Sequence, residues 1–493
     1  MSTFPLSSES SRRRWLQSTA CGFGYLAFKS LCADGVAAED APAVDRASAD
    51  RNTSLVAKPG HLPARAKRII FIFMQGGPSQ VDTFDYKPRL AKEDGKKVEF
   101  DNARVMKRVA ERVFASPWKF SRHGQTGRWV SELFPHMARH VDDLCFIHSM
   151  HTNGVAHGPA TLFLHTGATN LIRPSMGSWV TYGLGTENQN LPGFMTIHPT
   201  PAKGGPRNYG NAFLPTVFQG TAIGRAGVPV GKAGIKNIQN PSLGTSEQRR
   251  RFEFLQALNQ EQIRGRHDRT GNADPDGDME LDAVLGSYEL AYRMQGAAPA
   301  VLDLASETRQ TLDRYGIGEK ATEDFGRQCL MARRFAEAGV RYIQVNYADN
   351  ANTPRWDQHS NLQQHEKHAL AVDKPVAALL ADLKARGLLE DTLVWWGGEF
   401  GRTPFAQGRD GRDHNPKGFT IWLAGGGVRP GLAYGATDEF GDTAVENKVH
   451  MHDLHATILH LLGLDHQQLT YRYAGRNFRL TDVHGSVVKE IMA

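Results

Sequence analysis

The sequence predicts an α/β fold in which a mostly parallel sheet is sandwiched between helices. A continuous apolar run, RIIFIFM at 68–74, is typical of a strand that is buried on both faces of a parallel sheet. Further apolar runs alternate with segments of helical periodicity, as in strand–helix–strand units. Several of these runs are followed by polar or glycine-rich loops, and α/β proteins bind their ligands at such strand ends.

The elements follow in chain order. Strands are expected at 68–74, 144–149, 340–346, 392–397 and 419–424, because each is a short apolar run. Helices are expected at 131–140, 325–339, 368–387 and 451–463. A further helix should open at Gly158-Pro159 and stop at Gly167, since the first turn tolerates proline and glycine ends helices. The stretch at about 240–325 has additional helical patterns and is interpreted as a helical insertion or cap.

The first 38 residues resemble an export signal. The segment SRRRWLQ at 11–17 has the order of a twin-arginine (Tat) signal. A short apolar run follows, and then a small-residue stretch that offers a cleavage site near Ala37 or Ala38. We expect export to the periplasm or the extracellular space, with no transmembrane anchor after signal removal. Residues 39–66 are interpreted as a linker, and residues 67–493 as the folded domain.

The composition gives little support to nucleic-acid binding. The chain carries a net charge of +6, but the expected signal contributes four basic and two acidic side chains to that total. No long basic stripe remains elsewhere in the sequence, so no nucleic-acid partner is expected. Outside the signal the cysteines are Cys145 and Cys329, which lie in apolar surroundings and are expected to be buried thiols.

The loops after the predicted strands are rich in groups that bind metals. Carboxylates and imidazoles from separate strand ends are what a divalent-metal site requires, because its ligands must converge in space. The candidates at this edge are Asp82, Asp85, His151, Asp349, Asp357, His359 and Glu399.

Several motifs together resemble the alkaline phosphatase–sulfatase superfamily. DTLVWWGGEFG at 391–401 and HMHDLHATILHLLGL at 450–464 are similar to segments of sulfatases, and HGPATLFLHTG at 157–167 occupies the place of the sulfatase nucleophile signature. GGPSQVDTFD, WDQHSN, GGEFGRTP and GRDHNPKGF most closely resemble a family of exported bacterial proteins, DUF1501, in a match that runs from about Arg68 to the end. The resemblance implies a sulfatase-like fold and a metal-dependent site.

The chain departs from the sulfatase pattern at three places. His157 stands where a sulfatase has an oxidised Cys or Ser and an alkaline phosphatase has Ser or Thr, so a conventional sulfatase is disfavoured. Glu399-Phe400 replaces an Asp-His pair. Gly76-Gly77 replaces the paired aspartates that follow the first strand, and nearby Asp82 is a candidate substitute.

The resemblance implies a rearranged set of site residues. The expected metal ligands are Asp82, Asp357, His359, Glu399 and His414. Arg402 is expected to hold a nonbridging oxygen of the substrate, or to pair with Glu399. His157 is a candidate catalytic residue, and its possible roles are metal ligand, nucleophile, donor to an anion, or a structural helix cap.

The function expected from these features is that of an exported metal-dependent hydrolase or transferase. Its substrate would be an anionic phosphate or sulfate ester, with a sulfated or phosphorylated glycan as one form. Two carboxylates and two imidazoles would suit Zn, Mn or Fe, whereas more oxygen ligands would suit Ca or Mg. The alternative is a non-catalytic exported binding protein that retains the sulfatase-like fold.

Overall fold

The computed structural model describes residues 55–236, 238, 244–270, 275–351 and 353–493. The expected signal at 1–38 and the first part of the expected linker lie outside the described residues. The rest of that linker packs on the domain. Leu55 is buried, Val56 forms an isolated parallel bridge with Thr186, and the Leu62 amide donates to the carbonyl of Gly463.

A nine-stranded sheet forms the centre of the domain, as the sequence predicts. Its strand order is β14-β6-β13-β10-β1-β9-β7-β8, with β17 also paired to β6. Every pairing is parallel except those of β13, which runs antiparallel to β10 and β6. The strands are β1 (Arg68–Met74), β6 (Leu144–His151), β7 (Phe194–Ile197), β8 (Thr221–Ile223), β9 (Tyr342–Tyr347), β10 (Thr392–Gly397), β13 (Phe419–Ala424), β14 (Ala433–Tyr434) and β17 (Val449–His450).

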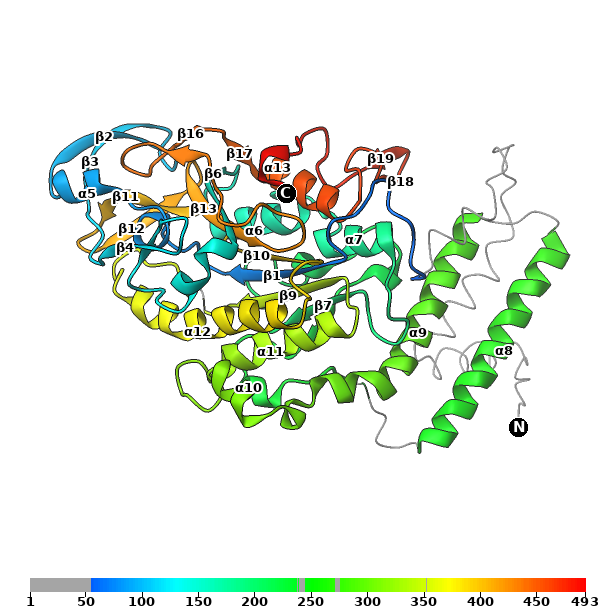
Figure 1. Cartoon of the computed structure of the whole chain (residues 1–493). Coiled ribbons are helices and arrows are strands. Elements are labelled where there is room, and N and C mark those ends of the chain that lie inside the picture. Colours follow the sequence, from blue (N-terminus) through cyan, green and yellow to red (C-terminus); the bar gives the residue numbers. More distant parts are fainter. Residues whose placement is uncertain (1–54, 237, 239–243, 271–274, 352) are drawn as a thin grey trace, which may run out of the picture. The chain divides into compact units, whose positions relative to one another are not determined.

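Helices cover both faces of this sheet, so the predicted fold class is confirmed (Figure 1). The alternating side chains of β1 show the two layers, because successive residues of a strand point to opposite faces. Ile70 and Ile72 pack in the core under α11 (Glu323–Glu337) and α12 (Gln364–Ala385). Ile69 and Phe71 pack in the core under α6 (His157–Thr166), α7 (Met176–Leu184) and α13 (Met451–Leu461).

The predicted insertion contains two long helices. They are α8 (Thr245–Thr270) and α9 (Pro275–Leu302), and they precede the short α10 (Arg309–Arg314) in the connection from β8 to β9. Leu290, Met294 and Ala298 of α9 are buried against the two cores.

Smaller elements surround the sheet edge where β1 ends. The two-stranded ribbons there are β2 (Lys97–Asn102) with β3 (Lys107–Arg112), β4 (Phe120–His123) with β5 (Arg128–Ser131), and β11 (Gly401–Gln407) with β12 (Gly411–Asn415). Two short helices, α4 (Gln80–Thr83) and α5 (Pro88–Lys92), follow β1. The remaining ribbons are β15 (Ala436–Thr437) with β16 (Ala444–Glu446), and β18 (Tyr471–Tyr473) with β19 (Arg476–Phe478).

The α-helix predicted at 131–140 is wrong. The segment begins as the last residue of β5 and enters a 3-10 helix at Met137–Asp143. Pro135 disfavours helical backbone at the residue before it. The carboxylate of Asp373 then accepts hydrogen bonds from the amides of His136 and Met137, each at 2.8 Å, and this starts the tighter turn.

Two further observations concern cysteines and membranes. Cys145 and Cys329 are buried free thiols, as expected. Among the described residues, no helix is both long enough and apolar enough to cross a bilayer.

Candidate metal centre

Four of the residues selected from the sequence meet at one edge of the sheet. They are His157, Asp357, His359 and His414, and one donor atom from each lies within 4.8 Å of the others. The topology explains why they meet. The chain leaves β6 and β9 at this edge towards His157 and towards Asp357 and His359. Because β13 is antiparallel, it starts at the edge where its neighbours end, so the preceding β12 brings His414 there.

The carboxylate of Asp357 lies at the middle of the group. Its Oδ1 is 2.8 Å from His359 Nε2 and 3.3 Å from His414 Nε2, and its Oδ2 is 3.0 Å from His157 Nε2. The Nε2 atoms of His359 and His414 are themselves 3.0 Å apart. Three imidazole nitrogens therefore converge on one carboxylate, and four such donors could hold one metal ion.

The second ring nitrogen of each histidine faces an acceptor outside this group. Nδ1 of His157 lies 2.6 Å from Glu399 Oε1, and Nδ1 of His414 lies 2.9 Å from the carbonyl oxygen of Val155. Nδ1 of His359 pairs with Oε1 of Gln407. Donation from Nδ1 leaves the Nε2 lone pair free to bind a metal, and metal-binding histidines usually have such a partner.

The charges in the group are strongly coupled. Burial would raise the pKa of the Asp357 carboxyl, but hydrogen bonds from His157, His359 and His414, and the charge of Arg402, hold it well below its usual range. Burial opposes protonation of His157, but its contacts with Asp357 and Glu399 outweigh burial and raise its pKa. The hydrogen bond to Asp357 raises the pKa of His359, while burial lowers that of His414. An ionised Asp357 therefore faces the three imidazoles.

Glu399 contacts a member of the group but is not one of the four converging donors. Its side chain is fully buried, and both carboxylate oxygens lie 3.1 Å from the amide of Gly76. Gly76 has φ = +110°, and a Cβ at that position would lie 2.8 Å from the amide nitrogens of Trp356 and Asp357. Glycine therefore lets the loop after β1 approach the loop after β9.

Arg402 is directed into the protein and has no exposed surface. Its Nη2 lies 2.8 Å from Asp357 Oδ1 and also donates to the carbonyl of Gly76. Its Nε donates to the backbone carbonyl of Gly77 at 3.0 Å, and its Nη1 donates to the backbone carbonyl of Arg412 at 3.2 Å. The guanidinium thus pairs with Asp357 rather than with Glu399, and most of its donors are already engaged within the protein.

Asp82 lies apart from the four converging donors. Its oxygens accept from Nε and Nη2 of Arg412 at 2.7 and 3.1 Å, and the hydroxyl of Ser79 also donates to it. Both side chains of this ion pair are fully buried. The carboxylate therefore anchors β12 to the loop after β1.

The sequence interpretation did not select several residues that surround the donors. Gln407 and Val155 hold His359 and His414, yet an isolated glutamine and a backbone carbonyl leave no recognisable signal in a sequence. Arg104 lies in the turn between β2 and β3, with Nη1 3.5 Å from Asp413 Oδ2 and 65% of its side chain exposed. A charged hairpin turn is common at protein surfaces, so Arg104 could be found only from the fold.

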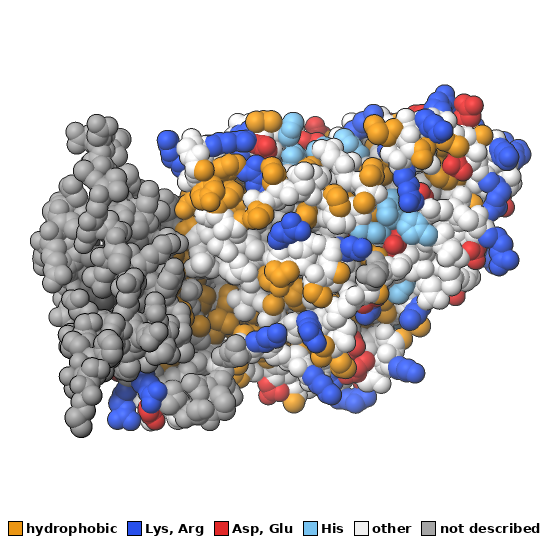
Figure 2. Space-filling view, turned by 180° about the vertical axis from the view of Figure 1, so that it is seen from behind, with side chains coloured by type: hydrophobic (Ala, Val, Ile, Leu, Met, Phe, Trp, Pro, Cys, Tyr) orange, Lys and Arg blue, Asp and Glu red, His pale blue; other side chains and the backbone are white. Residues whose placement is uncertain are grey.

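The candidate centre is partly open to solvent. The side chains of His359 and His414 are 32% and 15% exposed, whereas those of His157 and Asp357 are mostly covered. Figure 2 shows histidine side chains that reach the molecular surface beside acidic and basic groups. A small molecule would therefore approach from the side of His359 and His414.

Comparisons with known proteins give several solved structures of low similarity and one family. No curated protein sequence matches the chain. The lipoteichoic acid synthase LtaP of Listeria monocytogenes is 9% identical, with a TM-score of 0.34, over 89% of this chain and 80% of that one. An alkaline phosphatase superfamily protein from Vibrio parahaemolyticus is 9% identical, with a TM-score of 0.33, over 86% and 76%. The sulfatase PsFucS1 from Pseudoalteromonas sp. is 11% identical, with a TM-score of 0.30, over 81% and 68%.

The family comparison covers almost the whole described chain. Residues 66–492 match the family described as "Protein of unknown function (DUF1501)". This range begins two residues before β1 and takes in the sheet, both helical layers and all four converging donors. The resemblance noted in the sequence motifs is thus confirmed, and the chain belongs to the DUF1501 family.

Proposed function

We propose that this protein is a metal-dependent hydrolase or transferase acting on phosphate or sulfate esters, with one divalent ion held by His157, Asp357, His359 and His414. The observation that carries the proposal is the orientation of the three histidines. Each directs Nε2 towards Asp357, while Nδ1 faces an acceptor outside the group. When bound, the ion would polarise the ester oxygen and activate water.

The donor set favours particular metals. Three imidazole nitrogens and one carboxylate oxygen suit Zn²⁺, Mn²⁺ or Fe²⁺. Ca²⁺ and Mg²⁺ prefer sites built largely from oxygen ligands, so they suit this group less well. The proposed ion is therefore Zn²⁺, Mn²⁺ or Fe²⁺. Glu399 orients the ligand His157, and Asp82 anchors β12, which carries the ligand His414.

His157 is proposed as a ligand rather than a nucleophile. Both ring nitrogens are close to carboxylates, at 2.6 Å from Glu399 and 3.0 Å from Asp357. A nucleophilic imidazole needs a free nitrogen that faces the substrate. Thr161, which carries a hydroxyl one turn further along this helix, is fully buried. Water is therefore the proposed attacking group in the hydrolytic reaction.

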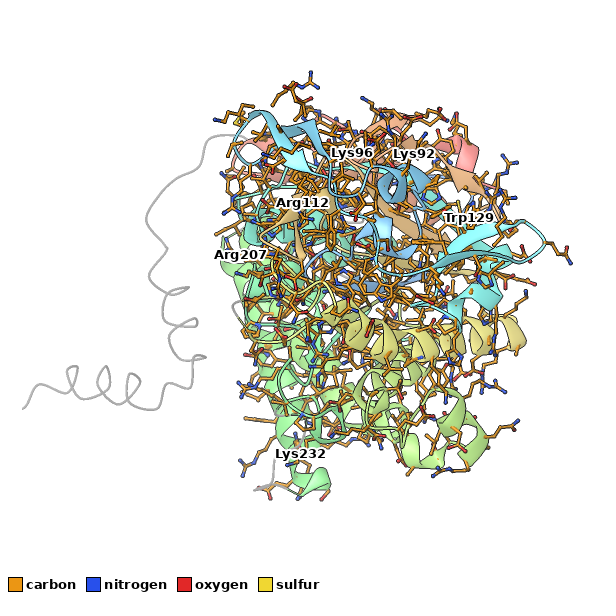
Figure 3. All side chains as sticks on the ribbon, turned by 90° about the vertical axis from the view of Figure 1, so that its left-hand side faces the viewer. Lys92, Lys96, Arg112, Trp129, Arg207 and Lys232 are labelled. Atoms are coloured by element: carbon orange, nitrogen blue, oxygen red, sulfur yellow. The ribbon has the colours of Figure 1, made fainter. Side chains whose placement is uncertain are left out.

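Arg104 is the proposed contact for the anionic part of the substrate. Arg402 is fully buried, whereas Arg104 is exposed and adjacent to Asp413, the residue before His414. The hairpin that carries Arg104 is rich in basic side chains. Figure 3 shows Arg112 at the open end of the hairpin, opposite the turn that carries Arg104, with Lys92 and Lys96 of the preceding segment nearby. The exposed Arg104 guanidinium beside the centre would attract an anionic ester, such as a sulfated or phosphorylated glycan.

The first experiment measures metal in the exported, folded protein by mass spectrometry. We expect one ion per chain in the wild type, and loss of that ion in both His359→Ala and Asp357→Ala. Glu132→Gln, a change at an exposed carboxylate just after β5, should retain it. Absence of metal after reconstitution with Zn²⁺, Mn²⁺ and Fe²⁺ would contradict the proposed centre.

The second experiment tests the reaction. The reconstituted protein should hydrolyse generic aryl phosphate or aryl sulfate esters, and Arg104→Ala should raise KM more than it lowers kcat. Trapping a covalent adduct on His157 would contradict the assignment of water as nucleophile. Stoichiometric metal with no turnover across phosphate, sulfate and glycan ester panels would favour the alternative of a non-catalytic binding protein.

Export by the twin-arginine route is part of the proposal. The Arg12-Arg13 pair carries the signal, and Tat export moves folded proteins that have acquired a metal before leaving the cytoplasm. Replacing both arginines by lysine should retain the protein in the cytoplasm, as measured by cell fractionation. Replacing the more distant Lys29 by Arg should leave export unchanged. Export of the double-lysine variant at the normal level would contradict the Tat assignment.

A further inference from the structure

A polar cavity is lined in part by Arg355, from the same connection as Asp357, and contains none of the four donors of the candidate metal centre. It has a volume of about 260 Å³ and is open on one side. Its walls come from the ends of β7 and β9, the segment 227–230 and the first turns of α11. The volume is just below the range of about 300–1,000 Å³ typical of sites for drug-sized ligands, so the cavity suits a ligand of about one ring.

Two buried polar side chains in the wall have no hydrogen-bond partner among the described residues. His198 and Gln328 are only 4% and 6% exposed, and His198 Nε2 and Gln328 Oε1 are both unpaired. An unpaired buried polar group costs about 1–3 kcal/mol, so nearly all such groups in proteins are paired. These side chains need hydrogen-bond partners that the described residues around them do not supply.

The backbone at His198 supports a functional role for the cavity. Its φ is +54°, a left-handed conformation that a non-glycine residue adopts at a cost of about 1–2 kcal/mol. Such strain persists where surrounding structure imposes it, and it is concentrated at ligand sites. Burial lowers the pKa of His198 to about 4, so the ring is neutral near pH 7 and offers one donor and one acceptor.

Opposite charges complete the polar side of the cavity. Asp324 uses one oxygen to accept from the Val230 amide at 3.0 Å, which leaves its second oxygen for a ligand. The Arg355 guanidinium lies 4.5 Å from the ring centre of Tyr347, and its nearest described carboxylate, that of Asp349, is 3.8 Å away. The opposite side of the cavity is apolar and is lined by Val228, Pro229, Val230 and Phe325.

This arrangement favours a neutral ligand with neighbouring hydroxyl groups. An anion would be repelled by Asp324, and a cation would be repelled by Arg355. Hydroxyls can donate to Asp324 or to the unpaired Gln328 Oε1 and accept from Arg355, because each hydroxyl is both donor and acceptor. A ring whose C–H face packs on the apolar side would complete the match. We propose that the cavity binds one uncharged sugar ring.

The cavity shares a loop with the candidate metal centre. Arg355 lies two residues before Asp357, and both belong to the connection that follows β9. Gln75 joins this connection to the end of β1, because it accepts from the amides of Asp349 and Trp356 at 3.3 and 3.2 Å. The sugar ring would thus be the uncharged part of a glycan ester whose charged group reaches the metal, a step that rests on the proposed function.

The experiment measures binding of methyl glycosides to the full exported protein by saturation-transfer NMR. The panel comprises the methyl glycosides of glucose, galactose, mannose, xylose, fucose and N-acetylglucosamine. We expect at least one to bind, and Asp324→Asn and Gln328→Leu each to weaken its affinity at least tenfold. Glu319→Gln, which changes a carboxylate outside the cavity near the start of the same helix, should bind as the wild type does.

The outcomes separate this inference from the proposed function. Absence of binding by every glycoside, or binding that neither cavity variant weakens in a folded protein, would overturn the sugar site. Asp357→Ala should lose metal yet still bind the glycoside. If glycosides bind through Asp324 but no ester is turned over with any metal, the proposed function fails and the sugar site stands.

Discussion

At the scale of single residues, the candidate centre depends on how each histidine ring is held. The four donor atoms lie close together, but an imidazole ring can rotate about its χ angles unless a hydrogen bond holds its second nitrogen. Glu399, Gln407 and the carbonyl of Val155 provide the three fixed partners. Glu399 differs from the other two because it is charged and fully buried, so it also increases the basicity of the His157 ring.

Replacing Glu399 by glutamine tests this support. The amide keeps the shape of the side chain but removes the charge that faces His157 Nδ1. We expect metal affinity to fall by about 10- to 100-fold, the usual effect of losing such a partner. A competition titration with a chromogenic chelator would measure it, and Glu132→Gln is the matched control on an exposed carboxylate. Unchanged affinity in Glu399→Gln would show that the Glu399 charge does not support metal binding.

At the scale of elements, the β11–β12 ribbon packs closely against the loop that carries Asp357 and His359. A Cβ at Gly411 would overlap the backbone carbonyl of His359, so only glycine permits this approach. The ribbon also carries Gln407 and His414, which contact His359. The distance between ribbon and loop therefore sets the relative positions of the two histidines.

Gly411→Ala should separate these two elements. The overlap with backbone cannot be relieved by a side-chain rotation, so we expect destabilisation of about 1–3 kcal/mol, as for other overpacked sites, together with weakened metal binding. Gly408→Ala is the control in the same ribbon. A Cβ there would make only an ordinary contact, 3.9 Å from the His359 carbonyl oxygen, but φ is +61°, so the variant should lose about 1–2 kcal/mol of stability without a change in metal affinity. Denaturant unfolding and metal titration of both variants distinguish the two effects.

The buried Asp373 carboxylate, which accepts from the amides at the start of the 3-10 helix Met137–Asp143, should make the stability of the fold depend on pH. Burial raises the pKa of Asp373 from 3.8 to about 6, although the His136 and Met137 amides work in the opposite direction. The folded protein therefore holds this proton more tightly than the unfolded chain does. The resulting stabilisation is fully present below about pH 4 and is lost as pH rises through 6.

Asp373→Asn should remove this dependence. Between pH 4 and pH 7, the free energy of unfolding of the wild type should fall relative to that of the variant by about 3 kcal/mol, at about 1.4 kcal/mol for each unit of pKa shift. Urea unfolding at both pH values measures the difference. A constant difference between the two proteins across this range would show that Asp373 titrates normally.

At the scale of the whole molecule, metal binding should stabilise the fold. The four donors come from three separate connections, which an unfolded chain does not bring together. An ion that binds only the folded protein at a hundredfold excess over Kd contributes about 2.7 kcal/mol. Zn²⁺ or Mn²⁺ should therefore raise the Tm of the wild type after chelation, whereas His359→Ala should show no rise. An equal rise in both proteins would indicate binding elsewhere.

The fold itself was largely predictable because its signals are local. The runs at 68–74, 392–397 and 419–424 coincide with β1, β10 and β13, since each strand is short, apolar and buried on both faces. The helix that stops at Gly167 was also expected, and that glycine adopts the left-handed φ of +69°. The segment 131–140 was mispredicted because Asp373, more than 230 positions away, holds its amides.

The sequence by itself determined the family, the fold class and the loops in which the site lies, because periodicity and motifs are properties of short segments. Only the tertiary structure decided which of the candidate side chains converge at the same site. Asp82 faces Arg412, Arg402 is turned inwards, and His157 joins Asp357 and Glu399, the latter 242 positions away. A side chain's partner depends on how strands pair across the sheet, and above all on the antiparallel β13 that brings His414 to the edge.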